Sequence, residues 1–81
     1  MNMFDIKLTK LGQTMEEGTV TAWFRTVGER FEVGDPLYEC ETEKALTEVE
    51  ATRAGILREI LVSDGDVVEV GTVIARADEV D

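Results

Sequence analysis

Lys44 is the residue of this 81-residue chain whose type and setting point most directly to chemistry. It lies in the segment ETEKALTEVE, residues 41–50, where it is the only lysine after Lys10 and has glutamates on both sides. A lysine amine can be acylated and can thereby anchor another group, but it is almost entirely protonated at neutral pH. We therefore expect Lys44 to be an attachment point that another protein activates.

The composition argues against most other chemistry. The chain has no histidine, which is the commonest general base and metal ligand, and its single Cys40 cannot form an internal disulfide. Asp and Glu outnumber Lys and Arg by 18 to 8, for a net charge of −10, which disfavours binding to nucleic-acid phosphates and anionic membranes. We expect no catalytic residue, no metal site, no nucleic-acid partner and no membrane partner, with Cys40 as a small core residue.

The length allows one small folded unit. At 81 residues with 43% hydrophobic residues, we expect residues 1–81 to form a single compact domain, monomeric when isolated, without a deep cleft. No run is long and apolar enough for a membrane span, and residues 1–8 lack the pattern of a signal peptide. A bacterial cytosolic location is the expectation.

An internal repeat organises the chain. Gly18, Gly28 and Gly34 are each followed 37 residues later by another glycine, at Gly55, Gly65 and Gly71. Apolar residues repeat at the same offset, in the pairs Val20 and Leu57, Trp23 and Ile60, Phe24 and Leu61, Phe31 and Val68, Val33 and Val70, and Leu37 and Ile74. Two copies are too few for a solenoid, so we expect quasi-repeats of about 3–40 and 41–77 to pack face to face.

Each half reads as short strands separated by glycine turns, and no segment keeps a helical spacing of apolar residues. We therefore predict an all-β fold, a flattened barrel or sandwich of two small antiparallel sheets with pseudo-twofold symmetry. The glycines are interpreted as turn residues that need a positive φ. Pro36 is expected at the first residue or at the edge of a strand, where its missing N–H costs no hydrogen bond.

The segment LYECETEKALTEVEA predicts a β-hairpin that turns at Glu43 and Lys44. In this register Thr42 faces Ala45, Cys40 faces Thr47 and Tyr38 faces Val49. The inner face would carry Tyr38, Cys40, Thr42, Ala45, Thr47, Val49 and Ala51, and the outer face Glu39, Glu41, Leu46, Glu48 and Glu50. Lys44 then projects from the tip. Taken alone, such a lysine is usually a solvated charge, and an acidic edge usually prevents strand addition.

From Leu8 to Ala77 the chain closely resembles the lipoyl domain of the acyltransferase components of 2-oxo acid dehydrogenase complexes. The resemblance rests on the order and spacing of LGQTMEEG, Trp23, VGERFEVGDPL, ETEKA and AGILREILVSDGDVVEVGTVIA. It implies a flattened barrel of two four-stranded sheets, with lipoate in amide linkage on Lys44 and with Glu43 and Ala45 recognised by the modifying enzyme. It also implies that the loop from Thr9 to Met15 lies beside the lysine turn, and that Lys10, Leu11, Gln13, Thr14 and Glu41 help a partner recognise the domain.

The partners implied by the resemblance are a lipoate ligase or lipoyl transferase, a thiamine-dependent 2-oxo acid decarboxylase, an acyltransferase core and dihydrolipoyl dehydrogenase. The lipoyl arm would carry acyl groups and electrons between the last three, with the domain itself non-catalytic. Two positions depart from the family pattern, because Glu43 replaces the usual aspartate and Thr9 the usual proline. Two alternatives are a biotin carrier, whose lysine usually lies in MKM rather than EKA, and an unmodified protein-binding module of the same fold.

Overall fold

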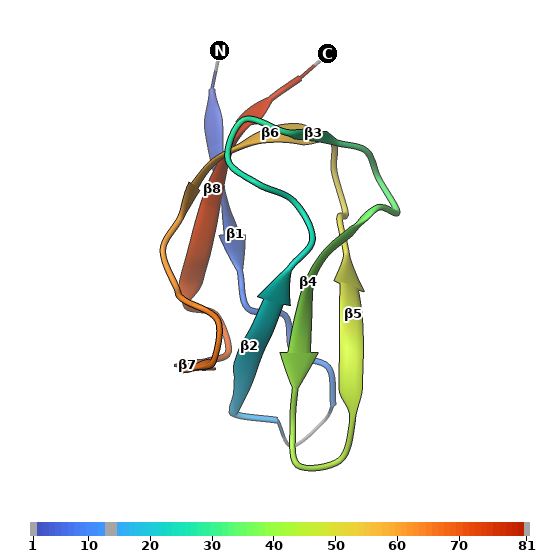
Figure 1. The fold of residues 1–81 in the computed structure, drawn as a ribbon, viewed down its shortest axis with the longest axis vertical. Helices are drawn as coiled ribbons and strands as arrows, with labels where there is room; N and C mark the ends of the chain where they lie inside the picture. Colours follow the sequence, from blue (N-terminus) through green and yellow to red (C-terminus); the bar gives the residue numbers. More distant parts are fainter. Residues whose placement is uncertain (1, 13–14, 81) are drawn as a thin grey trace.

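Two four-stranded antiparallel sheets make up the fold (Figure 1). The computed structural model describes residues 2–12 and 15–80. The strands are β1 (Met3–Lys7), β2 (Glu17–Trp23), β3 (Arg30–Phe31), β4 (Pro36–Glu41), β5 (Leu46–Glu50), β6 (Gly55–Ile60), β7 (Asp66–Glu69) and β8 (Val73–Glu79). Sheet A has the order β1-β8-β6-β3 and sheet B the order β5-β4-β2-β7. The predicted all-β architecture is confirmed, and Pro36 is the first residue of its strand, as expected.

The core lies between the two sheets and is wholly apolar. Its fully buried side chains include Tyr38, Phe31, Leu57 and Ile74, which come from both halves of the chain. Cys40 is also fully buried, as the sequence predicted for a small core residue. Within the described part of the chain there is no helix long and apolar enough to cross a membrane.

Hydrogen bonds made by the turn glycines repeat in the two halves and join them. The amide of Gly28 donates to the carbonyl of Leu57 (2.7 Å), and the amide of Gly65 donates to that of Val20 (2.6 Å). Each donor and each acceptor has its counterpart 37 residues along the chain. Because each turn is bonded to a strand of the other half, the two halves hold one another in place.

Four of the six repeated glycines have the positive φ that the sequence predicted, namely Gly28, Gly34, Gly65 and Gly71, at φ between 91° and 96°. The prediction was wrong for the remaining pair, which lies in strands and is buried. A Cβ on Gly18 would lie 2.6 Å from the Sγ of Cys40, and a Cβ on Gly55 would lie 2.9 Å from the carbonyl oxygen of Asp78. These two glycines are required for close packing and not for backbone conformation.

The first strands of the two halves, β1 and β5, are not related by the 37-residue offset that relates the rest of the repeat. In sheet A, Met3 pairs with Asp78, and in sheet B, Leu46 pairs with Glu41, which is 37 residues before Asp78. Met3 and Leu46 are therefore equivalent, although they are 43 residues apart. The difference arises because the β1–β2 segment, residues 8–16, is longer than the β5–β6 segment, residues 51–54. Of the longer segment, residues 11, 12, 15 and 16 lie beside the β4–β5 hairpin, at the bottom of Figure 1.

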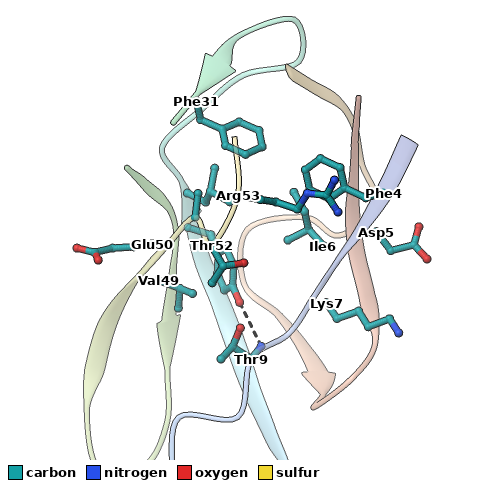
Figure 2. A pocket seen from close by; sticks show the side chains of 13 residues that line it. Phe4, Asp5, Ile6, Lys7, Thr9, Phe31, Val49, Glu50, Thr52 and Arg53 are labelled. Carbon is teal, nitrogen blue, oxygen red and sulfur yellow. Dashed lines mark hydrogen bonds between the residues drawn. The ribbon is translucent and has the colours of Figure 1, made fainter. Parts of the chain in front are cut away.

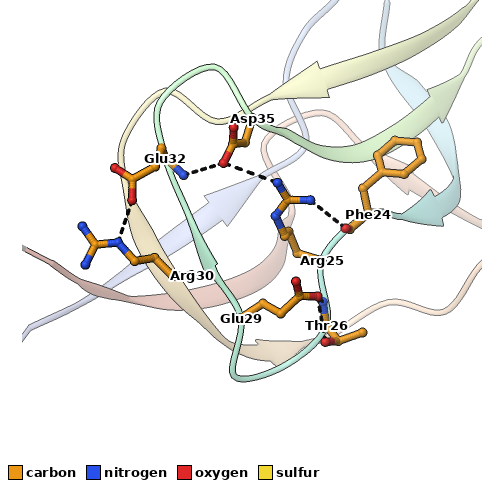
Figure 3. A network of polar contacts seen from close by, with 7 residues as sticks. All are labelled: Phe24, Arg25, Thr26, Glu29, Arg30, Glu32 and Asp35. Carbon is orange, nitrogen blue, oxygen red and sulfur yellow. Dashed lines mark hydrogen bonds and ion pairs between the residues drawn. The ribbon is translucent and has the colours of Figure 1, made fainter.

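A polar network fixes the connection between β2 and β4 (Figure 3). The Arg25 guanidinium donates to the carbonyl of Phe24 (3.0 Å) and forms an ion pair with Asp35 (3.3 Å). Asp35 also accepts the amide N–H of Glu32 (2.9 Å), and Glu29 accepts both the amide and the hydroxyl of Thr26. These hydrogen bonds hold the pKa of Asp35 and of Glu29 below the usual carboxyl range. The network makes the connection a defined structure instead of a loose loop.

Candidate functional site

Lys44 lies at the tip of the β4–β5 hairpin and is exposed, as predicted. The ladder below it has the predicted register, with Tyr38 opposite Val49 and Cys40 opposite Thr47. Above the last rung, the amide of Thr42 donates to the carbonyl of Ala45 (2.9 Å) and closes the turn. The backbone that carries the amine is therefore held by hydrogen bonds on both sides of the tip.

The turn itself needs no unusual backbone. Neither Glu43 nor Lys44 has a positive φ, which excludes the type I′ and II′ turns that favour Asn-Gly or Gly. The hydroxyl of Thr42 supports the turn from inside, since it lies 3.4 Å from the amide nitrogen of Lys44 and 3.3 Å from the carbonyl oxygen of Ala45. The turn conformation therefore does not require glycine or asparagine at the tip, and a lysine can occupy position 44 without backbone strain.

The predicted alternation holds along the ladder and fails at its end. Tyr38, Cys40 and Ala51 are buried, whereas Glu41, Leu46 and Glu48 are exposed. Ala45 was expected on the inner face, but it is exposed. Ala45 lies beyond the last rung, Glu41 to Leu46, and therefore belongs to the turn and not to the ladder whose side chains alternate.

An open depression lies beside Lys44. We call it the tip depression; it is lined by the hairpin residues 41–45 and 47, by β1–β2 residues 11, 12, 15 and 16, by β2 residues 17–19, and by Val67 of β7. Lys44 is itself one of the lining residues. The depression thus combines the amine with the β1–β2 segment, which the resemblance placed next to it.

The structure locates three of the five residues proposed for partner recognition. Leu11 and Glu41 line the tip depression, and Lys10 is exposed in the same β1–β2 segment. Gln13 and Thr14 lie outside the described residues. In the described part of the loop, the sulfur of Met15 accepts the amide N–H of Leu11 (3.2 Å).

Sequence reasoning missed Val67 as a neighbour of Lys44, whereas Met15 belongs to the loop that the resemblance placed beside the turn. Val67 reaches the site because β7 pairs with β2, in a register that sets Val67 opposite Thr19. A signal was present, since Val67 and Val68 are consecutive and a strand can bury only one of two successive side chains on its inner face. Val67 is 60% exposed, which identifies it as the outward member of the pair.

Charge is divided unequally between the sheets. The strands of sheet B carry seven carboxylates and no Lys or Arg, while those of sheet A carry four of each sign. The ion pairs found among residues 2–12 and 15–80 all lie outside the sheet B strands. Lys44 is therefore the positive charge of sheet B and its hairpin, and acylation of its amine would remove that charge.

A second, smaller hollow lies between the edges of β1 and β5 (Figure 2). Arg53 stacks 4.0 Å above the ring of Phe4 and forms an ion pair with Glu79 (2.8 Å). The hydroxyl of Tyr38 accepts the amide N–H of Thr9 (3.2 Å) at its floor. These contacts close the seam between the two sheets and carry no group with an obvious chemical role.

Comparison with known proteins agrees with this geometry. A family profile of biotinyl and lipoyl domains, described as "biotin-requiring enzyme", matches residues 5–77. The chain belongs to this biotinyl/lipoyl domain family. Members attach lipoate or biotin covalently to a lysine, and the names of the relatives favour the lipoyl type.

The curated relatives of this biotinyl/lipoyl domain are components of 2-oxo acid dehydrogenase complexes. It is 44% identical to the dihydrolipoyllysine-residue acetyltransferase component of the pyruvate dehydrogenase complex of Corynebacterium glutamicum, over 89% of this chain and 11% of that protein. It is 39% identical to the corresponding succinyltransferase component of the 2-oxoglutarate dehydrogenase complex of Staphylococcus saprophyticus, over 95% of this chain and 18% of that protein. The chain thus spans less than a fifth of these relatives.

Solved structures share the fold. The lipoyl domain of the 2-oxoglutarate dehydrogenase complex of Azotobacter vinelandii superposes with a TM-score of 0.74 and 31% identity, covering 93% of this chain and 95% of that one. A part of the urea carboxylase of Kluyveromyces lactis superposes with a TM-score of 0.76 and 26% identity, covering 95% of this chain and 6% of that one. The same fold therefore occurs in a lipoyl domain and in a part of a carboxylase.

The residues around the tip fit a covalently attached arm. A group joined to a lysine needs an exposed amine on a fixed backbone and room beside it. Lys44 is exposed, its turn is closed by the Thr42–Ala45 hydrogen bond, and the tip depression leaves space along one side.

Proposed function

We propose that this domain is a lipoyl carrier in which Lys44 holds lipoate through an amide bond. The observation that supports this most directly is the exposed lysine at the tip of a hydrogen-bonded hairpin, in a chain whose curated relatives are dihydrolipoyllysine-residue components. When bound, the dithiolane of lipoate supplies acyl transfer coupled to oxidation and reduction. The rigid sheets supply position.

The domain's own residues present the amine and do not activate it. Groups that line the depression beside Lys44 include the carboxylates of Glu41 and Glu43 and the hydroxyl of Thr42, and the chain has no histidine. A protonated amine cannot attack an activated acyl group, so a base must remove its proton. We assign that base to a lipoate ligase or lipoyl transferase, which would read Glu43 and Ala45 on either side of the lysine.

A second candidate, biotin carriage, is favoured by the structural likeness to a carboxylase. The sequence at the tip disagrees with it, because Lys44 lies in EKA and not between methionines. The two functions differ in the mass that the domain gains and in streptavidin binding of the modified protein.

The test is intact mass spectrometry of the domain after co-expression with a lipoate ligase. We expect one lipoyl adduct per chain, which Lys44→Arg abolishes. Lys7→Arg and Lys10→Arg are matched controls, since both remove an exposed lysine elsewhere in the chain, and both should leave the adduct in place. An adduct that persists in Lys44→Arg would reject Lys44 as the site, and a biotinyl mass would replace lipoate by biotin.

We further propose that residues 1–81 are one non-catalytic domain of an acyltransferase component, with quasi-repeats of about 3–40 and 41–77. Its partners would be a thiamine-dependent decarboxylase, the acyltransferase core and dihydrolipoyl dehydrogenase. The identities to acyltransferase components support this assignment. Residues 9–15 would help the decarboxylase recognise the domain, because the described part of this segment lies beside the hairpin. Exchanging this segment for that of another carrier should change the rate of reductive acylation and leave modification by the ligase intact.

A further inference from the structure

The tip depression contains apolar groups that a charged lysine amine does not need. Leu11 and Val67 are 37% and 60% exposed, and Met15 is half-buried beside them. They come from the β1–β2 segment and from β7, on the side of the hairpin away from β5. Exposed apolar side chains that gather around one functional group indicate a surface that is covered in some state of the molecule.

The strand register places one of these side chains in line with the hairpin. Leu46, Glu41, Thr19 and Val67 are successive partners across sheet B, so they form one row directly below the tip. Leu46 and Val67 occupy the two ends of this row and are equally exposed, at 59% and 60%. Val67 lines the tip depression and Leu46 does not, although Leu46 is much nearer to Lys44 in the sequence.

Modification changes what Lys44 can contact. As a free ammonium it is strongly hydrated, and the carboxylates of Glu41 and Glu43 line the same depression. As an amide it has no charge and continues into a long hydrocarbon chain, which gains free energy when apolar surface leaves water. Apolar lining suits the modified side chain, and Leu11, Met15 and Val67 provide it in a depression that also contains the carboxylates of Glu16, Glu17, Glu41 and Glu43.

We propose that the tip depression is a resting site for the lipoylated side chain of Lys44, with its hydrocarbon part against Leu11, Met15 and Val67. This rests on the proposed function, because it requires lipoate on Lys44. The docked arm exchanges with an extended arm that reaches partner enzymes. Gly18 lines the same depression, and a Cβ there would lie 2.6 Å from the Sγ of Cys40 and 3.0 Å from the Cε of Met15, so only glycine fits beside these two side chains.

The test compares amide resonances of the ¹⁵N-labelled domain in three forms, with Lys44 free, acetylated through genetically encoded acetyl-lysine, or lipoylated. The acetyl form loses the same charge but lacks the long hydrocarbon chain and the dithiolane of lipoate. We expect the lipoyl and acetyl forms to differ at Gly12, Gly18 and Val67, far from Lys44 in the sequence. Differences confined to residues 42–46 would overturn the proposal.

Variants at the two ends of the row distinguish binding of the lipoyl arm to the tip depression from a nonspecific effect of a group near the hairpin. Val67→Asp should abolish the lipoyl-specific shifts at Gly12 and Gly18, and Val67→Ala should reduce them, whereas Leu46→Asp, at the other end of the row, should retain them. Equal effects of Val67→Asp and Leu46→Asp would contradict the proposed site. The mass of each sample distinguishes the two proposals: no lipoyl adduct overturns both, while an adduct without remote shifts overturns docking alone.

Discussion

The Sγ of Cys40 occupies the space that a side chain at Gly18 would need, because a Cβ built on Gly18 lies 2.6 Å from it. Gly18 belongs to β2 and Cys40 to β4, so the contact is between neighbouring strands of sheet B. This pair explains why a glycine stands in the middle of a strand pattern, where it otherwise weakens the sheet.

Gly18→Ala should lower the free energy of unfolding by about 1–3 kcal/mol, as expected for overpacking a core. Cys40→Ala removes the obstructing sulfur and should cost about 1 kcal/mol alone. In the double variant the two costs should not add, and a favourable coupling of about 1 kcal/mol is expected. Denaturant unfolding of the four proteins measures this coupling.

Gly55→Ala is the matched control for that cycle. It occupies the equivalent place in sheet A, but its Cβ would meet the carbonyl oxygen of Asp78 at 2.9 Å and the rings of Phe4 and Phe31. Cys40→Ala should therefore give no rescue of Gly55→Ala. Rescue of both glycine variants alike would show that the Gly18–Cys40 contact is not the cause.

The turn glycines should respond to substitution through backbone strain alone. Gly28 and Gly65 have φ of 96° and 93°, and apart from their own chain neighbours no residue would place an atom within 4 Å of an added Cβ. Alanine at either position should cost about 1–2 kcal/mol. Gly12→Ala is the control, since Gly12 has equal space without a positive φ, and it should stay within about 0.5 kcal/mol of the parent. A similar loss in all three would disprove the strain argument.

The network around Asp35 predicts how stability depends on pH. The amide of Glu32, with the Arg25 guanidinium, holds the pKa of Asp35 below its usual range in the folded state. As the pH falls through the ordinary carboxyl range toward this lowered pKa, the unfolded chain binds protons first, so stability must fall. Asp35→Asn should show a shallower decline in stability over that acidic window. An unchanged slope in thermal unfolding would mean that Asp35 contributes nothing to acid sensitivity.

Cys40 should be chemically inert while the domain is folded. Its side chain is fully buried, and burial raises the pKa of its thiol, so very little reactive thiolate is present near neutral pH. An aromatic disulfide reagent should label it only at the rate of unfolding, and at full speed in denaturant. Rapid labelling of the native domain would contradict the packing described for β4.

The sequence was informative where one local rule decides the structure. Alternation from Tyr38 to Ala51 was sufficient for the hairpin register, because a slip of one residue would bury glutamates. The glycine repeat also revealed the two halves. It could not show that Gly18 and Gly55 serve packing while the other four serve turns, since that depends on which strand lies opposite.

The features that the sequence did not predict depend on contacts between segments that are distant in the chain. Val67 comes beside Lys44 through the pairing of β7 with β2, and no local pattern names that partner. Likewise, the exposure of Ala45 follows from where the ladder ends and not from the period of its side chains. Partner choice between strands is a global property of the fold, which short-range patterns do not contain.

The pairing of β1 with β8 has a consequence for how far the amine can travel. Met3 and Asp78 lie side by side at one end of the body, and the hairpin lies at the other end of its 37 Å long axis (Figure 1). If a flexible segment were joined before β1 or after β8, the domain would rotate about the end that is farthest from Lys44. The radius swept by the amine of Lys44 would then include the full length of the domain. The β-sheets therefore extend the reach of any group attached to Lys44, in addition to fixing its orientation.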